Sequence, residues 1–210
     1  MKRILFLSTP GCSCGFGRLV LGAASSTAGA GGPAAAAIRR CLGEENLCDG
    51  PEACRRAVRA QVRRGVDVIK IMTTGGVNSR IGAGLNKQMF EDEARALIET
   101  AHLYGKKVAV HAHGADGVKL ALKFGADSIE HGTLIDEEAV ELFVKTAAYY
   151  VPTLSTVNGY LERLAKDPNA YPPAVRVQSD WAYKWGLHGH IGTSRSAVFV
   201  FVAARVSGIA

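Results

Sequence analysis

Lys70, His111, His113 and His131 are the residues whose types and spacing could support chemistry in this sequence. Lys70 lies in the β-branched run 66–72, on the face that strand alternation assigns to every second residue. Desolvation lowers the pKa of a lysine on such a face, and a neutral amine can act as a base, form a Schiff base or take up carbon dioxide as a carbamate that bridges metals. The alternative is that Lys70 reaches from the strand end to water.

The histidines lie at the ends of two consecutive predicted strands. His111 and His113 point to the same side at the end of one strand, and His131 ends the next. Active sites of parallel α/β sheets and barrels lie at the carboxyl ends of the strands. Imidazole is a common ligand of zinc and similar divalent metals, and ligands from neighbouring strand ends can converge on one point. Together with Lys70, the histidines therefore predict a metal site.

Other polar residues and glycines border this group. Gly75 and Gly76 form a flexible loop after the lysine strand, and we expect this loop to border a substrate. The glycine and lysine spacing of a phosphate-binding loop is absent. Asp127 and Glu130 flank the last histidine. Strand alternation puts Glu130 on the opposite face from His131, so a salt link to a neighbouring strand or helix is the role that we favour for each acid.

A repeated pattern positions these residues. In each repeat a short β-branched run ends in polar residues and precedes a helix-periodic segment closed by glycine. The predicted strands cover residues 66–72, 107–111, 126–130 and 148–154, and the predicted helices cover residues 51–64, 91–104, 118–124 and 136–146. Such a succession is typical of a parallel sheet with helical crossovers, and it predicts an α/β fold.

Both ends of the chain depart from this pattern. Residues 1–45 form an atypical N-terminal segment, residues 46–184 form the predicted core, and residues 185–210 form a tail. The tail contains an apolar run that could be a strand. It also contains His188 and His190, whose HxH spacing invites a metal interpretation, but the pair lies where the fold pattern has lapsed and we do not favour it as a ligand pair.

Length and composition exclude several classes of protein. The 210 residues suffice for one folding unit, and no apolar run reaches the roughly 18 to 20 residues of a membrane span. A net charge of +6 could suggest nucleic acid, but the basic residues are scattered over helical surfaces without interleaved aromatic residues, so we expect no nucleic-acid partner.

The cysteines and the N-terminus bear on the compartment. Five cysteines, at positions 12, 14, 41, 48 and 54, show no paired CxxC spacing, so the sequence supports neither a disulfide framework nor a zinc ribbon. The apolar run in residues 1–7 is too short for a secretory signal peptide. We therefore expect a cytoplasmic, reducing environment.

The residues around this site resemble the amidohydrolase superfamily, in particular the branch of imidazolonepropionase-related enzymes and Xaa-Pro or Xaa-Arg dipeptidases. The similarity covers roughly residues 15–183. The motifs that carry it are DVIKIMTTGGV at 67–77, VHAHG at 110–114, IEHG at 129–132 and VPTL at 151–154.

The resemblance implies an eight-stranded (β/α) barrel of the TIM type, of which this chain spans about strands three to seven, with residues 18–21 as the third strand. It implies two divalent metals, with zinc expected. Lys70 is then the carboxylated bridging ligand, His111 and His131 are metal ligands, and His113 is a substrate-side residue. In that family the metals lower the pKa of a bridging water, so that hydroxide attacks the amide carbonyl.

The resemblance also limits the prediction, because three of the six ligands that it implies have no counterpart here. We predict an amidohydrolase that cleaves amide or peptide bonds of small substrates such as dipeptides. One alternative is an inactive, truncated barrel fragment or interaction module that associates with another copy through its open sheet edges. Another is a metal-free lyase that uses Lys70 as a Schiff base, although such an enzyme has no need of both His111 and His131.

Overall fold

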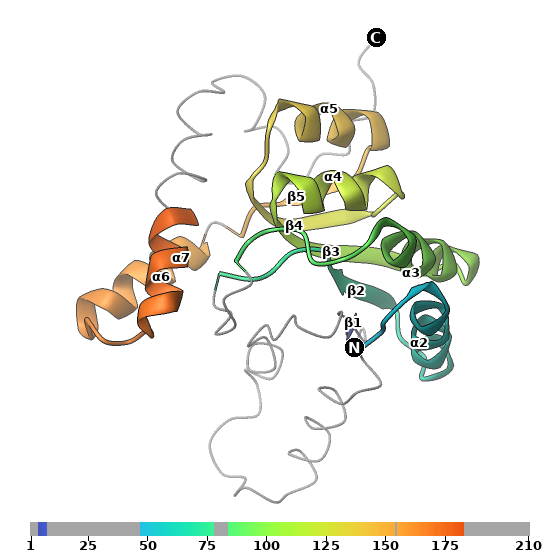
Figure 1. The fold of residues 1–210 in the computed structure, drawn as a ribbon, viewed down its shortest axis with the longest axis horizontal. Helices are drawn as coiled ribbons and strands as arrows, with labels where there is room; N and C mark the ends of the chain where they lie inside the picture. The colour runs from blue at the N-terminus through green and yellow to red at the C-terminus, as the bar shows by residue number, and fades with distance from the viewer. Residues whose placement is uncertain (1–3, 8–46, 78–83, 154, 183–210) are drawn as a thin grey trace, which may run out of the picture.

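The computed structural model describes residues 4–7, 47–77, 84–153 and 155–182 (Figure 1). Neighbouring strands of its sheet are parallel and follow one another in sequence order. The strands are β1 (Ile4–Leu7), β2 (Val68–Met72), β3 (Lys107–Gly114), β4 (Ser128–Leu134) and β5 (Tyr149–Val151). This arrangement confirms the predicted α/β fold with parallel strands, and closure into a barrel stays a prediction.

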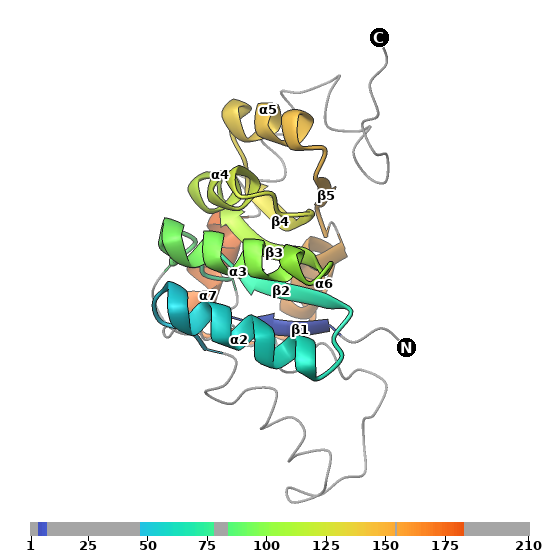
Figure 2. The same ribbon diagram turned by 90° about the vertical axis from the view of Figure 1, so that its right-hand side faces the viewer.

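Helices α2 to α5 alternate with the strands. The helices are α2 (Pro51–Arg63), α3 (Glu91–Leu103), α4 (Ala115–Lys123), α5 (Glu137–Thr146), α6 (Ser155–Lys166) and α7 (Pro173–Trp181). Helices α2 to α5 follow one another in the same order as the strands that they connect (Figure 2). Helices α6 and α7 lie on the other side of the strands from α2 and α3 (Figure 1). Each of the four predicted strands and four predicted helices is present, with ends that shift by a few residues.

The hydrophobic core lies between the sheet and helices α2 to α5. Strand side chains of one parity belong to the same apolar cluster as helix residues such as Leu97 and Ile98. These strand residues are all fully buried: Ile69, Ile71, Val108, Val110, Ala112 and Ile129. Because burying one large aliphatic side chain contributes about 1.5 to 3 kcal/mol, this face fixes the register of the strands. The other parity, which includes Lys70 and His111, is left to face away from these helices.

A buried carboxylate joins the first turns of α2 and α3. Glu93 is 4% exposed, and its two oxygens accept the backbone N–H groups of Gly50 and Phe90, each at 2.9 Å. The first N–H groups of a helix have no partner within the helix, so a buried helix start needs acceptors of this kind. Glu93 therefore holds together the starts of two helices that precede and follow β2.

A disulfide links Cys48 to Cys54, so the expectation that the cysteines form no disulfide is wrong for this pair. Cys48 precedes α2 and Cys54 lies in its first turns, which brings their Cα atoms to 4.8 Å. Both residues are buried in the core. The search for CxxC spacing missed the pair because the helix start, rather than a short motif, brings together two residues that are six positions apart.

Strand β1 was missed by the sequence analysis, which read residues 1–7 only for a signal peptide. Ile4–Leu7 pairs in parallel with β2, although no helix pattern follows it directly in the sequence. The expected strand at residues 18–21, the apolar run of the tail and the pair His188 and His190 all lie outside the described residues. Within the described part of the chain, no helix has the length and apolar character needed to cross a membrane.

The substitution Glu93→Ala tests the link between α2 and α3. We expect the free energy of unfolding to fall by about 2 to 3 kcal/mol, because two backbone N–H groups lose a charged, buried acceptor. Urea denaturation followed by circular dichroism measures the change. Glu99→Ala, at an exposed position of the same helix, is the matched control and should change stability by less than about 0.5 kcal/mol. Equal, small losses for the two variants would show that the contact contributes nothing.

Candidate metal centre

Three imidazoles meet beside β3 and β4. The ring centroids of His111, His113 and His131 lie 4.7 to 4.8 Å from one another, and the rings of His113 and His131 are stacked with an interplanar angle of 12°. One ring nitrogen of each residue lies within 4.8 Å of the others. His111 and His113 are 2% and 5% exposed. The structure thus brings together the three histidines that the sequence analysis singled out.

The backbone at His131 is left-handed, with φ of +74°. The register pairs Glu130 with His111 and His131 with Ala112, so a regular strand would point His131 toward the helices. The positive φ, which is uncommon outside glycine, turns its ring back toward His111. The expectation that Glu130 and His131 lie on opposite faces is therefore wrong, because this backbone turn breaks the alternation.

Lys70 and Glu130 form an ion pair next to the histidines. Lys70 is 4% exposed, which rules out the alternative that it reaches water. Burial lowers its pKa, and the nearby Glu130 carboxylate opposes that shift without cancelling it. The partner of Glu130 lies on β2, two strands away rather than on a neighbouring strand, but the predicted salt link itself is confirmed. So is that of Asp127, which binds Lys107 at 2.6 Å and His102 at 2.8 Å on the exposed side of the fold.

Each imidazole has a hydrogen-bond partner outside the cluster. The Nδ1 atoms of His113 and His131 lie 2.8 Å from the hydroxyl oxygens of Thr133 and Thr153. Nε2 of His111 lies 3.3 Å from the carbonyl oxygen of Gly75, and because a carbonyl only accepts, this nitrogen carries the proton.

Thr133 and Thr153 were not among the site residues predicted from the sequence. Thr153 lies within the VPTL motif, whereas Thr133 follows the IEHG motif and lies outside it, so the resemblance marked only the position of Thr153. Their hydroxyls could not be assigned to particular rings, because each threonine reaches a histidine about 20 residues earlier in the chain.

The three imidazoles are neutral at pH 7. Burial, followed by the charges of neighbouring histidines, holds the pKa of His111 and His113 well below 6.5. Burial, followed by the charge of Lys70, lowers the pKa of His131 to about 4. Neutral imidazole is the form that binds metals, and a compact set of buried nitrogen donors suits zinc. The donor set therefore fits a divalent metal.

The glycine loop after β2 closes against the cluster. A Cβ atom on Gly75 would lie 2.0 Å from the carbonyl oxygen of Gly84, so only glycine allows this approach. The neighbouring Thr74 hydroxyl accepts the backbone N–H of His113 at 2.9 Å. Gly75 and Gly76, expected to border a substrate, are both buried here, and contact with a substrate stays a prediction.

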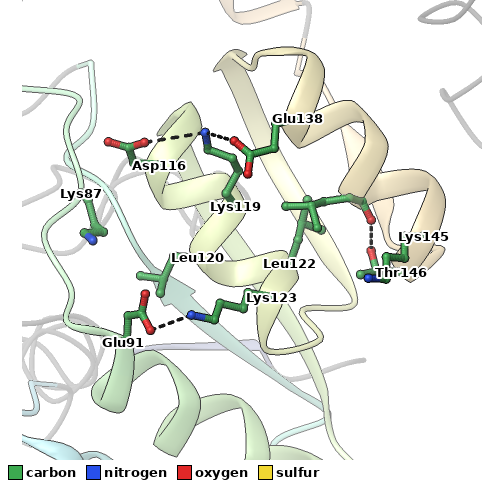
Figure 3. A pocket seen from close by; sticks show the side chains of 11 residues that line it. Lys87, Glu91, Asp116, Lys119, Leu120, Leu122, Lys123, Glu138, Lys145 and Thr146 are labelled. Carbon is green, nitrogen blue, oxygen red and sulfur yellow. Dashed lines mark hydrogen bonds and ion pairs between the residues drawn. The ribbon is translucent and has the colours of Figure 1, made fainter.

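A groove of about 590 Å³ lies elsewhere, over α4 and α5 (Figure 3). It is lined by charged side chains that largely neutralise one another, as Lys119 does with Glu138 and Lys123 does with Glu91. None of the clustered histidines, nor Lys70, lines it. The groove is therefore separate from the candidate metal centre.

Comparison with known proteins places the chain in a family. Residues 10–182 match the Amidohydrolase family, and the chain belongs to it. Ochratoxinase from Aspergillus niger is 40% identical over 115 residues, which are 55% of this chain and 24% of that protein. The resemblance inferred from the motifs is confirmed.

Solved structures support the same assignment. A Xaa-Pro dipeptidase with bound methionine in the active site matches with a TM-score of 0.61 and 41% identity over 68% of this chain and 38% of that one. A prolidase complexed with N-methylphosphonate-L-proline matches with a TM-score of 0.62 and 33% identity over 68% and 35%. The chain thus spans less than two fifths of the length of each of these three relatives.

The depressed pKa of His131 predicts a pH-dependent stability. Below pH 6.5 the unfolded chain binds a proton at this residue while the folded chain does not, so stability falls as the pH drops toward about 4. Between pH 7 and pH 5 this residue should account for about 2 kcal/mol of lost unfolding free energy. We expect His131→Asn to remove this contribution to the pH dependence of the unfolding free energy, since asparagine does not titrate. Asparagine also tolerates the left-handed backbone. Urea denaturation at several pH values measures both proteins, and identical pH profiles would contradict the assignment.

Proposed function

We propose that this chain forms the metal-binding part of a (β/α) barrel hydrolase that cleaves amide or peptide bonds in small substrates derived from amino acids, such as dipeptides. The observation that carries the proposal is the convergence of three neutral, buried or partly buried imidazoles from adjacent parallel strands, in a chain of the amidohydrolase family. Catalytic groups at strand ends are the usual arrangement in such barrels.

His111 and His131 would hold a divalent metal, with zinc preferred by nitrogen donors of this kind. Lys70 lies close enough to influence the pKa of both histidines. After leaving Glu130, its neutral amine can add to carbon dioxide and lose a proton, which gives a carbamate with an oxygen donor. A bound metal would supply the positive charge that lowers the pKa of water and polarises the amide carbonyl.

His113 is proposed as the substrate-side imidazole. Its ring is stacked on His131 and is held by Thr133, so it can present its remaining nitrogen to a bound substrate without moving. The substrate class rests on the relatives, since the dipeptidase holds methionine in its active site and the prolidase holds an analogue that contains proline. Gly75 and Gly76 would form the adjoining wall.

The five strands are proposed to form a continuous arc of the barrel, with β2 to β5 as strands four to seven and β1, instead of residues 18–21, as strand three. The parallel order and the alternating helices support this placement. A second candidate function, an interaction module, is favoured by β5, which pairs on one side only among the described strands and exposes Tyr149 and Val151. A strand edge of this kind can pair with another chain, including a second copy.

Zinc binding tests the metal centre. The purified chain, refolded with zinc and bicarbonate, should retain zinc through gel filtration, and elemental analysis measures the content. His111→Ala and His131→Ala should lose the zinc, because each removes a nitrogen donor. His102→Ala is the control, since this histidine is 39% exposed and pairs with Asp127 away from the cluster. A wild-type chain without zinc, or variants that keep it, would contradict the proposal.

Hydrolysis of Xaa-Pro dipeptides tests the reaction. Activity should disappear with a chelator, return with zinc, and fall more than about 100-fold in Lys70→Met, which keeps a long side chain but cannot form a carbamate. Release of free proline measures the rate. Cleavage that persists after chelation, together with borohydride trapping of substrate on Lys70, would instead favour the Schiff-base lyase.

A further inference from the structure

We infer that Thr133 and Thr153 are positioning residues of the histidine cluster, each fixing the tautomer and the ring orientation of a histidine on the preceding strand. The role of His131 as a metal ligand rests on the proposed function, whereas the hydrogen bonds themselves do not. Neither threonine is proposed to contact the substrate or a metal. Both act through an imidazole.

The two contacts repeat one geometry across consecutive strands. Thr133 of β4 reaches Nδ1 of His113 on β3, and Thr153, just after β5, reaches Nδ1 of His131 on β4. Both distances are 2.8 Å, and the two rings lie nearly parallel. Each histidine is thus held by the neighbouring strand rather than by its own. The same ring atom is used in both cases, which gives the two imidazoles one common orientation.

A ring nitrogen that carries a proton cannot bind a metal, so the tautomer decides which edge of the ring can act as ligand. A threonine hydroxyl can donate or accept, and in the arrangement that we infer Nδ1–H donates to the threonine oxygen, which leaves the lone pair on Nε2. His111 is held in the opposite sense, because its Nε2–H donates to the carbonyl of Gly75. Metal-binding histidines commonly donate their second ring N–H to a fixed acceptor, which sets the orientation of the ring and raises its basicity.

The backbone supports a role in positioning. His131 and Thr153 both have positive φ, at +74° and +49°, and such conformations cost free energy for residues other than glycine. They persist only where the surrounding structure fixes them, and they concentrate at functional sites. Thr153 is fixed on its other side as well, because its carbonyl accepts the N–H of Thr156 at 3.0 Å where α6 begins. Two of the three described non-glycine residues with positive φ are therefore the partners of one hydrogen bond, and the third, Ala147, ends α5.

The direct test is the tautomer of His131 in the metal-free chain of 210 residues. Two-bond ¹H–¹⁵N correlation spectra at pH 7.5 distinguish the Nδ1–H form from the Nε2–H form of each histidine. We expect His131 in the Nδ1–H form in the wild type, a shift toward the Nε2–H form in Thr153→Val, and restoration in Thr153→Ser, which keeps the hydroxyl. Thr133→Val should shift His113 in the same way.

The matched control is Thr73→Val. Thr73 is fully buried, whereas Thr153 is partly buried, and the Thr73 hydroxyl donates a hydrogen bond at 3.0 Å to the carbonyl of Gly117 rather than contacting an imidazole. This variant loses a buried hydroxyl without touching a histidine ring, so the histidine spectra should not change. A shift in Thr73→Val equal to that in Thr153→Val would overturn the inference, because it would mark a general loss of order.

Zinc titration by calorimetry supplies the second measurement. Thr153→Val should bind zinc about 10- to 100-fold more weakly than the wild type, and Thr153→Ser should bind within about threefold of it. A wild type that binds no zinc refutes the proposed function, and the tautomer spectra still decide the inference. Should Thr153→Val fail to fold, the wild-type spectrum decides, because an Nε2–H form of His131 there overturns the role of Thr153.

Discussion

Burial of one face of the parallel sheet against α2 to α5 is the constraint on which the rest of the structure depends. Successive strand residues point to opposite faces, so the apolar residues of one parity fix, through their packing, the position of every residue of the other parity. Lys70 and His111 belong to that second set. The placement of these two side chains on one face is thus a consequence of aliphatic packing on the far side of the sheet, to which neither of them contributes.

Burial on the polar face carries a desolvation cost for any charged side chain, and the histidines and Lys70 meet this cost in different ways. An imidazole avoids the cost by staying neutral, as the lowered pKa values of the three histidines show. Lys70 meets it by pairing with Glu130. The same surroundings that hold the imidazoles ready for a metal therefore hold the lysine in a salt link, and Glu130 competes with any other partner that Lys70 can take.

The elements from residue 51 to residue 151 could be predicted from the sequence, because periodicity and glycine stops record local backbone preferences. The residues of the site could be predicted because they end strands. The direction of the His131 side chain could not, since the left-handed turn at this residue depends on contacts with other strands. The Cys48–Cys54 link and the threonine contacts were missed for a related reason, as they join residues that only the folded chain brings together.

Each histidine that a threonine contacts and the hydroxyl that holds it belong to successive βα units. A single unit therefore carries a ligand for its own position and a support for the position before it. During divergence, exchange of one unit by recombination would separate a histidine from its partner on one side. Two adjacent βα units must therefore be inherited together to keep a histidine with its threonine. Substitutions at His131 and Thr153 should be correlated among descendants of a common ancestor.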